Sequence, residues 1–194
     1  MSKGEETKQA IVDQALELVS TVGLEKLTIG ALANATGMSK SGLFAHFKSK
    51  EQLQLHVLQE AKQRYIEVVA RPAFKEPRGE PRVRAIFERT MKQWENDLPG
   101  GCVFHAVAAE LDDKPGPARD YLVSVLRDQQ QMLRRAAEIA VAEGDFREDL
   151  DLDLFVFELS SITGAFHVSG RLLGDTNAEE MSQRAFEALL RRAH

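Results

Sequence analysis

The chain has 194 residues, a hydrophobic content of 43% and a formal net charge of −5. This length fits one large domain or a small domain joined to a larger one, and the hydrophobic content is sufficient for a packed core. The charge is uneven, +1 over residues 1–64 and −6 over residues 65–194, which excludes a uniformly basic nucleic-acid coat and favours phosphate binding on one face only.

The first predicted element is an amphipathic helix over residues 5–22, which Gly23 ends. Its apolar residues recur at helical spacing, with Glu, Gln and Asp on the opposite side. The apolar face comprises Ile11, Ala15, Leu18, Val19 and Val22.

Residues 28–50 predict two short helices joined by a tight turn. The Thr28 hydroxyl can cap the first helix, and Gly37 stands where a left-handed residue can close it. Ser39 begins the second helix, whose apolar residues are Leu43, Phe44 and Phe47. Two helices with a glycine in the turn indicate a helix-turn-helix, in which the second helix enters the DNA major groove.

The outward side of this second helix is small or basic, and no acid lies between Lys26 and Lys50. Such a surface suits an anionic partner. The charge pattern by itself is equally typical of an ordinary surface helix that lacks acids.

The combined pattern is more specific. Thr28-Ile-x-x-Leu-Ala-x-x-Thr-Gly-Met-Ser-Lys-Ser-x-Leu-Phe-x-His-Phe-x-Ser-Lys-Glu-x-Leu53 resembles the DNA-binding domain of TetR/AcrR-type transcriptional regulators. The resemblance implies an all-helical homodimeric repressor that leaves its DNA when a small molecule binds the C-terminal domain. The chain departs from the family at Phe44, where the family usually has a Tyr whose hydroxyl touches a phosphate.

The resemblance and the helix-turn-helix together give a set of expected contacts with a double-stranded, palindromic operator. Residues 39–47 are expected in the major groove, with Lys40, Ser41 and Gly42 closest to bases or backbone, while Thr28, His46, Lys48 and Lys50 are expected at phosphates. The complete set of DNA-binding candidates is Thr28, Ser39, Lys40, Ser41, Gly42, Phe44, His46, Lys48 and Lys50.

The rest of the chain is predicted to be helical. Ser49 and Gln52 form a capping box that starts a helix running to about Ala70, where Arg71-Pro72 should stop it. A polar linker over residues 71–80 is followed by helices from Pro81, over residues 103–111, 118–143 and 154–173, and beyond residue 176. We therefore expect an all-α fold of about nine helices. The expected domains are residues 1–50 for DNA binding, 51–70 as a connecting helix, and 71–194 for effector binding and dimerisation.

Large or adaptable side chains in the C-terminal part suggest an apolar effector cavity with a few polar anchors. Ordinary core packing is the alternative for each of them. The resemblance places the pocket among the fifth to eighth helices, with His105 and His167 as the expected polar anchors. The candidates are Phe87, Met91, Trp94, Phe104, His105, Met132, Phe166 and His167.

The last two helices are the expected dimer interface, because residues 154–173 are apolar on more than one side. An intramolecular core is the alternative. The candidates are Phe155, Leu159, Ile162, Gly164, Phe166, Phe186, Leu189 and Leu190.

The sequence gives little support for a metal site, a redox-active cysteine or catalysis. Cys102 and His105 are three residues apart, but two ligands are too few for a metal site, so we expect no metal and no cofactor. A redox response at Cys102 is an alternative mode of regulation, since a helix start can lower the pKa of a thiol. Phosphate-loop, zinc and nucleophile-elbow motifs are absent from the sequence, so we expect no catalytic residues and no enzyme.

A single cysteine permits no internal disulfide, which fits a reducing compartment. The first eight residues lack the apolar run of a signal peptide, and no apolar stretch approaches the ~18 residues of a membrane span. We expect a cytoplasmic protein with no membrane partner.

Overall fold

The computed structural model describes residues 3–194, which form two compact units. The first unit contains the chain up to Arg64 together with Leu98–Val125. The second contains Tyr65–Asp97 and Leu126–His194. This grouping by contact brings Leu98–Val125 together with the N-terminal helices, whereas the predicted domains follow the order of the chain.

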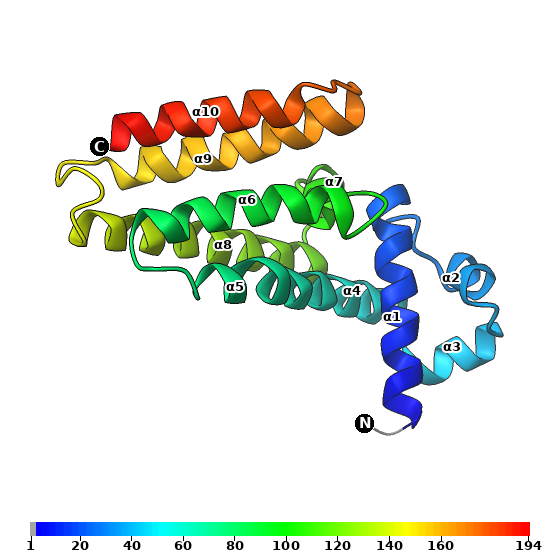
Figure 1. Cartoon of the computed structure of the whole chain (residues 1–194). Helices are drawn as coiled ribbons and strands as arrows, with labels where there is room; N and C mark the ends of the chain where they lie inside the picture. Colours follow the sequence, from blue (N-terminus) through cyan, green and yellow to red (C-terminus); the bar gives the residue numbers. More distant parts are fainter. Residues whose placement is uncertain (1–2) are drawn as a thin grey trace. The chain divides into compact units, whose positions relative to one another are not determined.

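The first unit is built from α-helices alone (Figure 1). Its helices are α1 (Lys3–Val22), α2 (Ile29–Thr36), α3 (Lys40–His46), α4 (Lys50–Tyr65), α7 (Val103–Leu111) and the first part of α8 (Pro117–Ala142).

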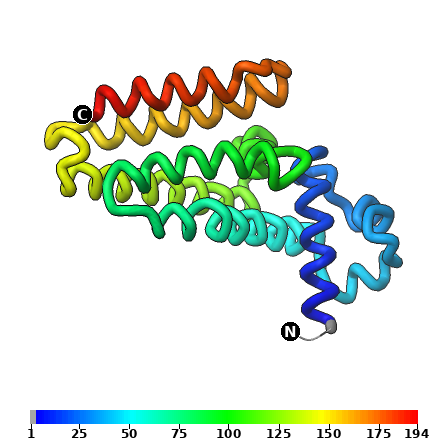
Figure 2. The backbone as a smooth tube through the Cα atoms, viewed as in Figure 1, coloured from blue at the N-terminus to red at the C-terminus, as the bar shows by residue number. Residues whose placement is uncertain are grey.

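The second unit is helical as well, and Figure 2 shows its last two helices running side by side in opposite directions. Its elements are the π-helix η1 (Ile66–Ala70), α5 (Arg71–Ala73), α6 (Glu80–Asn96), the remainder of α8, α9 (Leu152–His167), the π-helix η2 (Val168–Leu172) and α10 (Ala178–Ala193).

The all-α prediction is confirmed, and residues 3–194 contain no strand. Because α4, η1 and α5 follow one another without a break, as do α9 and η2, the described elements form nine continuous helical rods.

The expected helix end at Arg71-Pro72 is wrong by a few residues, since helix continues to Ala73. A proline inside a helix lacks a donor and crowds the carbonyl four residues before it. The wider π-turn directly before it, in which the Arg71 amide donates to the Ile66 carbonyl, makes room for the Pro72 ring.

The core of the first unit is formed where α1 packs on the helix-turn-helix and on α7. Val12 and Leu16 are buried in α1, whereas the predicted Leu18 and Val22 keep partial exposure. At the centre, the buried Phe47 ring has the Lys8 ammonium 5.7 Å from its centroid and the His56 ring against its edge.

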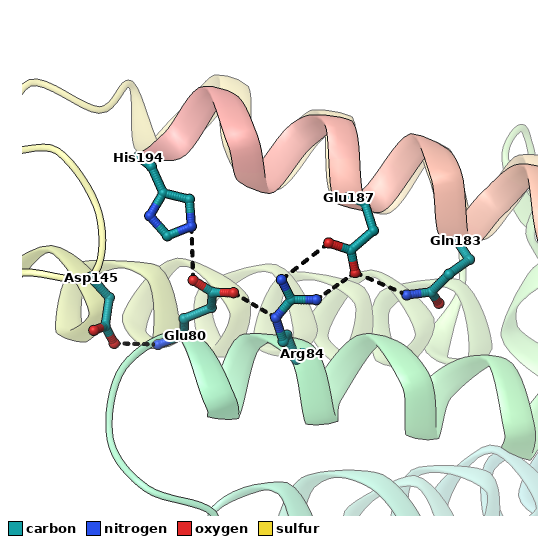
Figure 3. A network of polar contacts seen from close by, with 6 residues as sticks. All are labelled: Glu80, Arg84, Asp145, Gln183, Glu187 and His194. Atoms are coloured by element: carbon teal, nitrogen blue, oxygen red, sulfur yellow. Dashed lines mark hydrogen bonds and ion pairs between the residues drawn. The ribbon is translucent and has the colours of Figure 1, made fainter.

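The core of the second unit lies between α6, α8, α9 and α10. Phe87 of α6 stacks on Phe186 of α10 with 4.0 Å between ring centroids. Arg84, one turn before Phe87, binds Glu187 of α10 with both terminal nitrogens and Glu80 with Nε (Figure 3). Apolar stacking and a bidentate ion pair therefore fasten α6 to α10.

Candidate nucleic-acid interface and regulatory unit

The turn between α2 and α3 has the predicted local geometry. The Thr28 hydroxyl accepts a hydrogen bond from the Ala31 amide at 3.0 Å. Gly37 is left-handed with φ of 68°, and the Ser39 hydroxyl accepts from the Gly42 amide at 3.1 Å. Both helices thus begin on a side-chain cap, and glycine permits the reversal between them.

The short α3 has one buried and one exposed face. Leu43 and Phe47 are fully buried, four residues apart. Lys40, Ser41 and Phe44, by contrast, are exposed, and so are Ala45 and Lys48 beyond them. The buried face fixes which side of α3 is turned outward.

Phe44 does not join the apolar face formed by Leu43 and Phe47, because its side chain is 54% exposed. Adjacent helical residues are about 100° apart around the axis, so Phe44 points away from the face that buries Leu43. The ring therefore lies on the outward surface of α3 beside Ser41.

Several candidate DNA contacts also have partners within the chain. The Ser39 and Ser41 hydroxyls lie 3.1 Å apart. The Lys50 ammonium donates to the Glu25 carbonyl at 2.6 Å, which occupies one of its three donors. His46 is partly buried in contrast to the exposed Lys48.

Two hydrogen bonds of Gln52 hold the start of α4. The Gln52 amide donates to the Ser49 hydroxyl at 3.1 Å, as predicted. The Gln52 side chain in turn accepts from the Lys48 amide at 3.0 Å. The backbone that presents Lys48 is therefore held by the capping box.

Glu25, the acid just before the acid-free stretch, forms an ion pair inside the first unit. Glu25 forms an ion pair with Lys114, and that hydrogen-bonded ammonium lowers the pKa of the Glu25 carboxyl. The Glu25 amide donates to the Glu110 carboxylate at 3.0 Å. The loop before α2 is thereby tied to α7 and to the segment that follows it.

The eight effector candidates are divided between the two units. Phe104 and His105 belong to the first unit, and His105 is exposed. In the second unit, the buried side chains of Phe87, Met91 and Phe166 are part of the core. Ordinary packing accounts for these three.

Three effector candidates of the second unit keep partial exposure. The Trp94 ring meets the His167 ring edge-on with 5.6 Å between centroids. Met132 lines a pocket of about 520 Å³ on α8, together with Phe74 and charged or polar residues. Its other lining residues are Asp128, Gln131, Arg134, Arg135 and Glu138.

The dimer candidates fall mainly in the core of their own chain. Only Ile162 and Gly164 keep partial exposure. Six are buried, which is the alternative that the sequence left open: Phe155, Leu159, Phe166, Phe186, Leu189 and Leu190.

A different set of apolar residues is exposed on α9 and η2, and the sequence analysis missed it. Phe157 is 70% exposed and Leu172 is 79% exposed. Residues exposed on the side of α9 and η2 that faces away from the core recur every three or four positions. We call these six residues the outer stripe: Leu154, Phe157, Ser161, Ala165, Val168 and Leu172. Assigning the apolar residues of 154–173 to separate helix faces by their 3.6-residue periodicity would have identified the outer stripe.

The alternative of a redox-active Cys102 is not supported by its surroundings. Desolvation of the thiol raises its pKa to about 11, the opposite of the direction expected from a helix start. A thiolate is the reactive form, so the raised pKa disfavours reaction of Cys102 near neutral pH. Within residues 3–194, no cluster of three or more His, Cys, Asp or Glu residues could hold a metal ion.

The described helices include none that is long and apolar enough to span a membrane.

Comparison with known proteins agrees with this architecture. The family described as "Bacterial regulatory proteins, tetR family" matches residues 11–57, and the "Tetracyclin repressor-like, C-terminal domain" family matches residues 79–186. The HTH-type transcriptional repressor KstR2 of Mycolicibacterium smegmatis is 25% identical over 192 residues, which cover 92% of this chain and 88% of that protein. The HTH-type transcriptional regulator TcmR of Streptomyces glaucescens is 28% identical, with 95% and 81% covered.

A solved structure gives the same result. The crystal structure of a TetR transcriptional regulator from Chloroflexus aurantiacus superposes with a TM-score of 0.87 at 26% identity, covering 98% of this chain and 95% of that one. The second family match alone spans more than half of the chain and includes most of the core of the second unit. The chain therefore belongs to the TetR family of transcriptional regulators.

Proposed function

We propose that this regulator is a homodimeric repressor that binds a palindromic operator and is released from it by a small, largely apolar effector. The observation that carries the DNA-binding part is the outward face of α3, which is exposed, free of acids and fixed in orientation by the buried Leu43 and Phe47. The name of KstR2, a transcriptional repressor, supports the direction of regulation.

The proposed DNA contacts follow the position of each side chain. Lys40, Ser41 and Phe44 enter the major groove from the outward face of α3, where Ser39 and Gly42 bring the backbone close. Thr28, His46, Lys48 and Lys50 hold phosphates on either side.

Dimerisation uses the outer stripe in this proposal. An exposed apolar stripe on an otherwise packed helix is unfavourable in water, and burial against a second copy removes it. The equivalent stripe of the partner provides a self-complementary surface of the kind that a two-fold axis requires. Two reading helices related by that axis would lie about one DNA turn apart, which accounts for a palindromic operator.

The effector is proposed to bind in the second unit near Trp94, His167 and Met132. These side chains combine apolar surface with a ring nitrogen, and they retain partial exposure. Binding shifts the population between two arrangements of α4, and operator affinity falls. Coupling of this kind is typically about 1–3 kcal/mol and acts in both directions.

Regulation without catalysis is part of the same proposal. The family consists of regulators, and the second unit's charged network around Arg84 holds α6 to α10. We also infer a cytoplasmic location, where the operator would be accessible.

Fluorescence anisotropy of labelled DNA tests the proposal. Purified protein is titrated against the DNA that flanks its own gene, with random DNA of the same length as the control, at ~150 mM salt. We expect saturable binding by one or two dimers with a preference of at least ~10³ over random DNA. Equal affinity for both DNAs would contradict operator recognition at that locus.

The effector site is tested on the same samples. Trp94 is the only tryptophan of the chain, so its fluorescence reports on this part of the second unit. Apolar compounds that release the operator should change Trp94 emission, and His167→Ala should weaken both effects together. Release of the operator without any change in emission would place the effector elsewhere.

A further inference from the structure

We infer that Phe44 determines operator specificity by packing its ring on a thymine methyl group in the major groove. The inference rests on the proposed function and adds to it a defined base preference.

The exposure of Phe44 is exceptional within its unit. Among residues 3–64, it is the one large hydrophobic side chain that the fold leaves exposed. Its neighbours toward solvent are small: Ser41 lies one turn before it and Ala45 directly after it. Neither of these two side chains is large enough to stand between the ring and a partner.

The chemistry of the ring limits what it can recognise. Phenylalanine has neither donor nor acceptor, so Phe44 cannot form the hydrogen bond to phosphate that a tyrosine would supply. Among the base edges of the major groove, the apolar group is the C5 methyl of thymine, while the other exposed groups are donors or acceptors. Burying the ring against that methyl is favourable, and burying it against an amino group or carbonyl leaves a polar group without water.

The surrounding side chains hold the ring at the groove. Lys40, one turn earlier on the same face, supplies a cation for a phosphate or a guanine edge. Lys48, in the non-helical segment just after α3, supplies another for the backbone. A ring with one cation before it on α3 and another just beyond the end of the helix is drawn against the DNA whatever the sequence, and the methyl then decides which base pair fits.

Removing the C5 methyl group from single thymines of the DNA tests the inference. Once the operator is identified, each thymine in one half-site is replaced in turn by deoxyuridine, which lacks only the C5 methyl. For the wild type we expect one position at which this replacement weakens binding about 4-fold, the effect of one buried methyl-sized group. For Phe44→Ala we expect weaker binding to the normal operator and no further loss at that position.

Lys48→Ala is the matched control, because it changes another exposed residue of the same surface. It should weaken binding to all DNAs alike and retain the 4-fold effect of the methyl group. Since Phe44 is exposed, its replacement should leave the thermal unfolding temperature unchanged, and circular dichroism checks this.

The outcomes separate the two levels of the proposal. If the wild type binds its operator tightly but no thymine shows a methyl effect that Phe44→Ala abolishes, the ring packs on the sugar–phosphate backbone and this inference is overturned while the regulator function stands. If the wild type prefers no operator at all, both are overturned.

Discussion

Gly100 lies in the segment just before α7, where the chain meets α1. Replacing Gly100 by alanine should destabilise the first unit. Gly100 is buried, and its amide donates to the Ser20 hydroxyl at 3.0 Å. A Cβ atom built on Gly100 would lie 1.7 Å from the Ser20 carbonyl oxygen and 1.9 Å from the carbonyl carbon. Both of these are backbone atoms, so no side-chain rotation can relieve the overlap.

The magnitude follows from this geometry. Real contacts of Cβ atoms essentially never fall below 3.0 Å, so α1 and the segment before α7 would have to separate by more than about 1 Å. Overpacking of this kind costs about 1–3 kcal/mol, and the loss of the hydrogen bond to Ser20 adds about 1 kcal/mol. The total of about 2–4 kcal/mol corresponds to a decrease in Tm of roughly 10 °C for a chain of this size.

Thermal unfolding followed by circular dichroism at 222 nm measures the effect. Gly30→Ala is the control, because a Cβ there would meet its nearest neighbours at the ordinary distance of 3.8 Å. Gly30 lies in α2, so alanine should leave Tm unchanged or raise it slightly. A Tm of Gly100→Ala within 2 °C of the wild type would refute the reasoning and show that α1 and the α7 segment are not held in contact.

Four further changes test other parts of the structure. Phe157→Asp should convert the dimer to monomer in analytical ultracentrifugation with its helical content intact, because the side chain is 70% exposed; a dimer of unchanged affinity would remove the outer stripe from the interface. Lys50→Ala should weaken binding to all DNAs alike and reduce the slope of log K against log salt by about 1, since a phosphate contact releases a counterion, and an unaltered slope would exclude that contact. The hydrogen bonds and charge of Arg84 lower the pKa of Glu187. The stability that the Glu187 carboxylate contributes is therefore present above the ordinary pKa of about 4.5 and is lost as pH falls below it. Glu187→Gln should be less stable than the wild type in urea unfolding at pH 7, and the difference in stability between the two proteins should narrow toward pH 3. Because desolvation raises the pKa of Cys102 to about 11, iodoacetamide should label the native protein at pH 7.5 much more slowly than the urea-unfolded chain, and equal rates would contradict the desolvated thiol.

The placement of charged clusters illustrates why function could not be assigned from residue type alone. Arg84, Glu80 and Glu187 form a polar network in the second unit, yet this network holds two helices together. The His194 ring joins this network through Glu80 at 3.0 Å, and Asp145 accepts from the Glu80 amide at 2.8 Å. Arg84 and Glu187 are 103 residues apart in sequence, so only the folded chain identifies the network as structural.

The helix-turn-helix is the part that the sequence determined by itself. Its signals are local: the caps at Thr28 and Ser39 and the left-handed Gly37 each act within four residues, and the structure has all three. The same holds for the positions of the long helices and for the all-α fold, because hydrophobic period and helix breakers are short-range properties.

Only the tertiary structure decided which face of each helix is inside. The sequence marked residues 154–173 as apolar all round, but packing against α6 and α10 buries Phe155 and Leu159 and leaves Phe157 outside. Likewise, the burial of Leu43 turns Phe44 outward, although both are apolar and adjacent. Burial depends on which distant helix covers a side chain, and that choice is made by the whole set of long-range contacts rather than by any residue's own chemistry.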